Sequence, residues 1–96
     1  DEIKIGLKVN SQLISIEGMG NGPIDAMIDA LKNHFSMDIK ISDYHQHAIS
    51  SGSDAKAVAY SELLLNGQSV WGVGIHQNTV IAGLQSVISG LNRLSI

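Results

Sequence analysis

Two short stretches of the sequence can do chemistry. In the segment DYHQHA, Asp43, His45 and His47 stand at alternate positions. On an extended strand these side chains share one face, and a carboxylate with two imidazoles can ligate a transition metal or serve acid–base catalysis. A polar strand face turned to solvent explains the same pattern. We favour that explanation, and predict no metal site, because nothing nearby in the sequence completes one.

The second stretch is the glycine-rich run GMGNGP at residues 18–23, which leads directly into an apolar-periodic segment. A helix N-terminus carries unpaired N–H groups and a partial positive charge, which suit a carboxylate or a phosphate. Glycines let such a ligand approach the backbone with no Cβ in the way. A sharp turn alone is the simpler explanation of the spacing. A nucleotide is disfavoured, because the third glycine of a dinucleotide fingerprint would fall at Pro23.

Other catalytic machinery is scarce. Ser50, Ser51 and Ser53 lack the context of a nucleophile elbow, and no carboxylate pair has a spacing that suggests hydrolysis. The chain has no cysteine, which excludes a thiolate nucleophile and a disulfide, so a reducing cytoplasm is the simplest location. We therefore predict no catalytic residue. The residues alone favour a small-ligand-binding or assembly module over an enzyme.

Composition narrows the range of partners. The 96 residues suffice for one small domain, 1–96, and carry six basic and nine acidic side chains for a net charge of −3. The basic residues form no cluster, so we predict no nucleic-acid partner. The longest apolar runs, such as residues 80–84, are too short to span a membrane, and we predict no membrane partner. The opening Asp-Glu, without an initiator methionine, suggests an excised piece of a longer chain.

The first half of the chain predicts a hairpin followed by a helix. Residues 3–9 alternate apolar and polar side chains, and residues 13–17 resume the pattern after a turn. The apolar residues that follow Pro23 recur at helical spacing, and proline is tolerated in a first turn. We predict Asn21 as the N-cap of this helix and an end near Ser36.

The second half predicts three strands and a second helix. The strands are expected over residues 38–50, 55–65 and 69–75. Asn-Gly at residues 66–67 is a strong hairpin signal between the last two strands. A second apolar stripe with helical spacing begins after Asn78 and runs nearly to the end of the chain.

The predicted fold class is therefore α+β, with the order β-β-α-β-β-β-α. Residues 3–36 and 37–96 would form two pseudo-repeated sheet-plus-helix units. Both halves contain a Gly-x-Gly strand end (GMG and GVG), a short polar loop with an asparagine, and an amphipathic helix. We interpret this likeness as a degenerate duplication, which would place two strand-to-helix junctions close together.

Three motifs in order, GNGPIDAMIDAL, DYHQHAISSGSDAKAVAY and WGVGIHQNTVIAGLQSVISGLNR, resemble the C-terminal regulatory domain of 2-isopropylmalate synthase. The resemblance covers residues 3–93. It implies a domain with no cofactor of its own, whose catalytic partner is a separate TIM barrel with a divalent metal. It also implies a homodimer that binds leucine near its interface and thereby inhibits the distant active site. The related citramalate synthases share Gly-Asn-Gly-Pro and imply isoleucine as effector, but DYHQHA and VWGVGI favour leucine.

The resemblance also implies an effector site. In that site a helix N-terminus would hold the ligand carboxylate, Asp54 or a backbone carbonyl would take the ammonium group, and apolar side chains would enclose the branched chain. Asp25 would either repel the ligand or orient its ammonium group. A purely structural dimerisation domain and a small metalloenzyme are the alternatives from other functional classes. The implied site residues are Gly20, Asn21, Gly22, Pro23, Ile24, Tyr44, Ala48, Asp54, Ala55 and Ile75.

Overall fold

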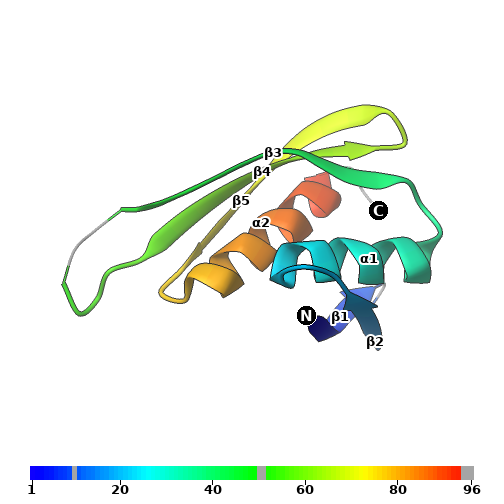
Figure 1. Cartoon of the computed structure of the whole chain (residues 1–96), viewed down its shortest axis with the longest axis horizontal. Coiled ribbons are helices and arrows are strands. Elements are labelled where there is room, and N and C mark those ends of the chain that lie inside the picture. Colours follow the sequence, from blue (N-terminus) through cyan, green and yellow to red (C-terminus); the bar gives the residue numbers. More distant parts are fainter. Residues whose placement is uncertain (10, 50–51, 94–96) are drawn as a thin grey trace. The chain divides into compact units, whose positions relative to one another are not determined.

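A computed structural model describes residues 1–9, 11–49 and 52–93. The predicted α+β class and element order are confirmed (Figure 1). The chain forms two compact units, Asp1–Ile39 and Lys40–Ile96, which are described separately below. No helix in the described part of the chain is long and apolar enough to cross a membrane. The elements are β1 (Glu2–Val9), β2 (Gln12–Met19), α1 (Pro23–Phe35), β3 (Ile39–Ala48), β4 (Ala57–Leu65), β5 (Gln68–His76) and α2 (Thr79–Arg93).

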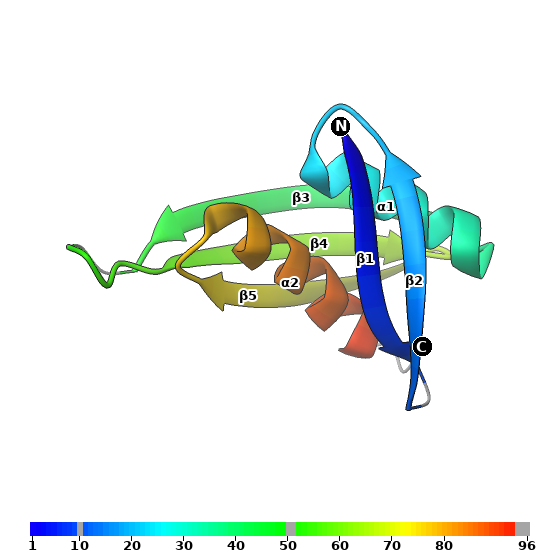
Figure 2. The same cartoon turned by 90° about the horizontal axis from the view of Figure 1, so that it is seen from below.

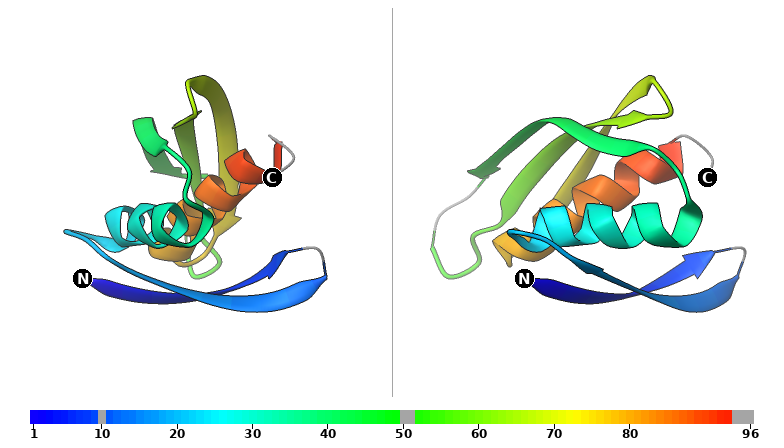
Figure 3. Two further views of the ribbon diagram at one scale, coloured as in Figure 1. Left: turned by 90° about the vertical axis from the view of Figure 1, so that its right-hand side faces the viewer. Right: turned by 45° about the vertical axis from the view of Figure 1, so that its right-hand side comes forward.

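The first unit is a hairpin with one helix. β1 and β2 pair antiparallel with Ile3 opposite Gly18, and α1 packs along β2 (Figure 3). A Cβ on Gly18 would lie 2.2 Å from the Ala26 carbonyl oxygen, so the helix rests directly on the strand backbone. The helix ends at Phe35, after which Ser36 adopts the left-handed conformation (φ 54°) and donates its N–H to a carbonyl of the last turn.

The predicted N-cap of α1 is wrong by one residue. Pro23 takes the first helical position, so the cap falls on Gly22 rather than on Asn21. Gly22 has no side chain to offer, and no side chain of the described residues caps this helix. Its φ of −165° and ψ of 175° are extended, a conformation that any residue adopts.

The second unit is a three-stranded sheet in the order β3-β4-β5 with α2 on one face (Figure 2). The Asn-Gly hairpin is confirmed: Leu65 lies opposite Gln68, and Asn66 and Gly67 both have positive φ. Alternate residues of β4 point toward α2 and are buried. Among them, Ser61 satisfies its hydroxyl by a 2.5 Å hydrogen bond to that of Ser86 on the helix.

The two units share a repeat with a constant spacing. Gly18 and Gly74 are 56 residues apart, and so are their strand partners, Ile3 and Ala59. The helices also begin 56 residues apart, at Pro23 and at residue 79. The predicted duplication is therefore supported in register, and the equivalent of Gly18 is Gly74 rather than the first glycine of the second Gly-x-Gly. A Cβ at Gly74 would meet the Ala82 carbonyl oxygen at 2.1 Å, as one at Gly18 would meet Ala26.

Candidate functional site

The two glycines that flank Asn21 serve different purposes. Gly20 lies against the start of α1, where an added Cβ would be 2.7 Å from both the Asp25 Cβ and the Ala26 nitrogen. Close packing therefore requires glycine there. A Cβ on Gly22 would meet nothing within 4 Å. Neither packing nor conformation explains glycine at this position, which leaves the backbone at the helix start open to an approaching ligand.

A depression of about 280 Å³ lies beside this junction. Asp29 on its wall is already engaged, since its carboxylate accepts hydrogen bonds from the Met19 N–H (2.9 Å) and the Asn33 side chain (3.3 Å). Asp25 is exposed one helical turn before Asp29. The depression therefore has a mostly polar lining, with the exposed Asp25 carboxylate and the apolar side chains of Met19 and Ile28 beside the start of α1. Its lining residues are Met19, Gly20, Asn21, Asp25, Ile28, Asp29 and Lys32.

The equivalent junction of the second unit is closed by the protein itself. Asn78, at the position equivalent to Gly22, accepts a hydrogen bond from the Ile81 N–H on its side-chain oxygen (3.1 Å). Its own N–H donates to Nδ1 of His76 (2.9 Å). Both helices make the corresponding first backbone bond, from Ala26 to Gly22 (2.9 Å) and from Ala82 to Asn78 (3.0 Å). The two junctions thus share a backbone geometry and differ in the side-chain cap.

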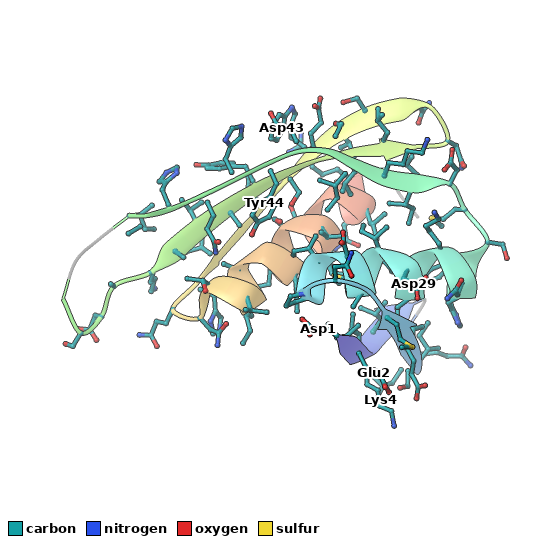
Figure 4. All side chains as sticks on the ribbon, viewed as in Figure 1. Asp1, Glu2, Lys4, Asp29, Asp43 and Tyr44 are labelled. Atoms are coloured by element: carbon teal, nitrogen blue, oxygen red, sulfur yellow. The ribbon has the colours of Figure 1, made fainter. Side chains whose placement is uncertain are left out.

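Tyr44 lies on the helix side of the second sheet. It packs against Ala57, Ala59 and Ala82, and this desolvation raises the pKa of its phenol above the ordinary value. Asp43 points to the opposite face (Figure 4). Gln46, two residues further along β3, donates its amide to the Thr79 carbonyl oxygen at 2.7 Å. The alternation predicted for DYHQHA is therefore confirmed.

The other implied site residues of the second unit are spread over the loop and the far face. Ala48 is exposed at the end of β3, and Asp54 is exposed in the turn that follows. Ala55 is half-buried and donates its N–H to the Gly52 carbonyl oxygen (3.2 Å). Ile75 points away from α2, because its neighbour Gly74 is the residue that contacts the helix. Within this unit, Tyr44 and Ile75 thus lie on opposite faces of the sheet.

The histidines of β3 are engaged on that far face. Nε2 of His45 lies 3.1 Å from the Asp43 carboxylate, and its ring stacks on Trp71 with centroids 6.3 Å apart. His47 lies 5.8 Å from the Tyr60 ring, centroid to centroid. Across residues 1–9, 11–49 and 52–93, no three histidine or carboxylate side chains are grouped as a metal ion requires.

Sequence reasoning considered Asp25 but missed the other residues of α1 that line the depression. Asp25, Asp29 and Lys32 follow each other at helical spacing, so they fall on one face of the helix. The helical spacing of these three residues can be recognised in the sequence alone. What it could not supply was the position of Met19, whose backbone is brought to Asp29 by the packing of β2 on α1.

Residues 1–95 match the family described as the LeuA allosteric (dimerisation) domain. The chain is 44% identical over 94 residues to a 2-isopropylmalate synthase of Schizosaccharomyces pombe, covering 98% of this chain. It is 41% identical over 95 residues to one from Parafrankia sp., covering 99%, and 42% identical over 87 residues to one from Mycobacterium leprae, covering 91%. The matched region spans 16%, 17% and 14% of those three proteins.

Proposed function

Because the chain belongs to the family of LeuA allosteric (dimerisation) domains, we propose that it is the regulatory part of a 2-isopropylmalate synthase. In this proposal it forms a homodimer, binds leucine, and transmits feedback inhibition to a catalytic domain elsewhere in the parent chain. The chemistry, with its divalent metal, belongs to that other domain. The family that residues 1–95 of this chain match is described as allosteric, which supports a regulatory role.

The difference between the two helix N-termini carries the leucine proposal. In the second unit the Asn78 side chain occupies the capping position, whereas at Gly22 that position is free of side chains and open. A ligand carboxylate at Gly22 would accept the hydrogen bonds that Asn78 accepts at the other junction. The partial positive charge of the helix end favours such an anion by about 0.3–1 kcal/mol.

The depression beside Gly22 supplies the rest of an amino-acid site. The Asp25 carboxylate lies on its wall and is suited to the ligand ammonium group, while Met19 and Ile28 provide apolar surface for a branched side chain. Of the two roles considered for Asp25, we thus favour orientation of the ammonium group over repulsion of the ligand, in place of Asp54 or a backbone carbonyl. The contributions of Tyr44, Ala48, Asp54, Ala55 and Ile75 stay predictions of the resemblance, and Ile75 lies on the face of β5 away from α2.

In this proposal, inhibition results from thermodynamic linkage between leucine binding and the arrangement of the regulatory dimer. Leucine binds one arrangement of the regulatory dimer better than another, and the difference in affinity biases the catalytic domains. A coupling of about 1–3 kcal/mol is typical of such systems.

Thermal unfolding of the chain with leucine, isoleucine, valine or no ligand tests the proposal. Leucine at a hundred times its dissociation constant adds about 2.7 kcal/mol, and each kcal/mol raises Tm by about 4–8 °C for a domain of this size. We expect a shift with leucine that the other two amino acids do not match at equal concentration. A shift selective for isoleucine would move the chain to the citramalate branch, and no shift with any of them would leave only the dimerisation role.

A further inference from the structure

Two asparagines of this chain are followed directly by glycine, at residues 21–22 and 66–67. In an Asn-Gly pair the backbone nitrogen of the glycine can attack the side-chain amide carbon of the asparagine, because glycine has no Cβ to hinder the approach. This reaction makes asparagine one of the thermolabile residues of proteins. The cyclic product requires both residues to rotate out of the conformations of helices, strands and tight turns. How firmly the fold holds each pair therefore decides which of them reacts.

The pair at Asn66 is held from both sides by its hairpin. Leu65 and Gln68 lie opposite each other at the end of the β4–β5 ladder. Asn66 and Gly67 have φ of 49° and 85°, which belong to the two-residue turn that joins the strands. Bringing the Gly67 nitrogen onto the Asn66 side chain would rotate both residues out of this turn and open the end of the ladder. The fold thus protects Asn66.

The asparagines that are not followed by glycine are also fixed where the structure describes them. The Asn33 side chain donates to the Asp29 carboxylate (3.3 Å), and the Asn78 side chain accepts from the Ile81 N–H (3.1 Å). Asn33 and Asn92 lie inside helices, where the N–H of the next residue is engaged in the helical hydrogen bonds.

The pair at Asn21 lacks these restraints. Residues 20–22 belong to no helix or strand, and Asn21 is exposed. Within residues 1–9, 11–49 and 52–93, no hydrogen bond engages the Asn21 side chain or the Gly22 N–H. Only the Gly22 carbonyl is held, since it accepts from the Ala26 N–H (2.9 Å). A Cβ on Gly22 would meet nothing within 4 Å, so the space beside this residue is open as well.

We propose that Asn21 is a modification site, at which the side-chain amide is lost spontaneously and a carboxylate takes its place. The Gly22 nitrogen gives its proton to solvent and bonds to the side-chain carbonyl carbon of Asn21, and the side-chain nitrogen leaves as ammonia. Water then opens the cyclic imide at one of its two carbonyl carbons. One opening leaves an ordinary aspartate, and the other routes the main chain through the side chain as isoaspartate. The net reaction consumes one water and releases one ammonia.

The position at a helix start favours the reaction and tolerates its product. The partial positive charge of the α1 N-terminus stabilises negative charge, both on the attacking nitrogen and on the carboxylate that is formed. The modified chain is therefore expected to stay folded, with its change confined to the junction between β2 and α1.

Either product alters the leucine site, and this step rests on the proposed function. Asn21 and Asp25 line the same depression, so an aspartate at position 21 adds negative charge where the ligand carboxylate is expected. Isoaspartate instead lengthens the main chain by one methylene group just before Gly22, which displaces the Gly22 N–H. The response to leucine should therefore fade as the protein ages.

Incubation of the folded chain in mildly alkaline buffer tests the modification site. Peptide mapping locates the mass gain of an amide-to-acid conversion, and the peptides EGMGNGPID and ELLLNGQSV give the rate of each pair without a fold. We expect Asn66 to react at least about tenfold more slowly in the protein than in its peptide, and Asn21 within about threefold of its peptide rate. Equal protection of both pairs would overturn the proposal.

Gly22→Ala is the matched control for the nucleophile. It adds one methyl group beside the attacking nitrogen, in a place where the fold has room for it. Amide loss at Asn21 should slow at least about tenfold, while the rate at Asn66 stays that of the wild type. An unchanged rate at Asn21 would overturn attack by the Gly22 nitrogen.

Leucine binding is read separately from the modification. Asn21→Asp reproduces one product and should bind leucine at least about tenfold more weakly, whereas equal affinity would refute the effect on the effector site. A chain that loses the Asn21 amide first but shows no thermal shift with leucine refutes only the effector site. A leucine-responsive chain in which Asn21 lasts as long as Asn66 refutes only the modification site.

Discussion

Gly22 and Asn78 hold the same place in the two repeats, yet they leave the two helix N-termini in different chemical states. One N-terminus is capped by a side chain, and the other is open to solvent. Because φ and ψ at Gly22 are extended, a capping side chain can be introduced there without strain. A single substitution at Gly22 can therefore cap the N-terminus of α1 and block the proposed carboxylate position.

The variants Gly22→Asp and Gly22→Asn should separate ligand binding from stability. Both residues are good N-caps, so we expect the ligand-free protein to keep its stability or gain up to about 1 kcal/mol. Leucine should bind at least about tenfold more weakly, a loss of about 1.4 kcal/mol, because the new side chain takes the place of its carboxylate. Thermal unfolding with and without leucine measures both quantities.

Gln77→Asp is the control for the added charge, since it places a carboxylate just before α2. Its leucine affinity should match that of the wild type. Unchanged affinity in both Gly22 variants would remove this junction from the effector site. A loss in the aspartate variant alone would point to charge repulsion rather than to occupation of the cap.

Tyr44 predicts a pH dependence of stability on the alkaline side. Burial raises the pKa of its phenol above the unfolded value of 10.0, so the folded state holds the proton more tightly than the unfolded chain. This contribution to stability is fully present below pH 10 and is lost as the pH rises through the folded-state pKa. In thermal melts between pH 9 and 11.5, Tyr44→Phe should show a smaller decline in Tm than the wild type. An identical decline in both proteins would contradict the assignment.

Among the elements, the strand–helix contacts depend on glycine at defined positions. A Cβ on Gly18 would collide with the backbone of α1 at Ala26 and Ala30, where no side chain can move aside. Gly18→Ala should therefore cost at least about 2 kcal/mol, within the range known for overpacked cores. Gly22→Ala is its control: it meets open space and loses only cap preference, at most about 1 kcal/mol. Chemical denaturation of the two variants gives the comparison, and equal stabilities would contradict the packing of α1 on β2.

The elements themselves were largely predictable from the sequence, because each has a clear period and a clear boundary. Pro23 and Asn78 mark the helix starts, and Asn66-Gly67 fixes one hairpin. The cap at Asn21 was mispredicted because asparagine is a good cap in general, whereas the proline moved the helix start one residue further on.

The site was less predictable, because its parts depend on register. Alternation correctly separated Tyr44 from Asp43 on β3, but the packing against α2 was needed to show which face is which. The same rule applied from Gly74 puts Ile75 on the face of β5 away from α2. The matching of Gly18 to Gly74 needed the strand pairing, since the two Gly-x-Gly motifs suggested a match two residues out of step. Contacts such as Asp29 with the Met19 N–H join segments ten residues apart and have no local signal.

For the whole molecule, leucine binding and dimerisation must be coupled if leucine regulates through the dimer. Suppose that dimerisation strengthens leucine binding by a factor α at each protomer. Saturating leucine must then raise the dimer association constant by the square of α, since two ligands are bound per dimer. Typical couplings put α at about 5–150.

Dilution of the chain makes this thermodynamic cycle measurable. Below the dimer dissociation constant the chain is a monomer, and its leucine affinity can be compared with that of the dimer at high protein concentration, which gives α directly. Sedimentation of the wild type with and without leucine gives the change that leucine causes in the dimer association constant. We expect the ratio of association constants to equal the square of the ratio of affinities. If both the ratio of leucine affinities and the ratio of association constants equal one, leucine binding and dimerisation are independent. Any inhibition would then have to act within a single protomer.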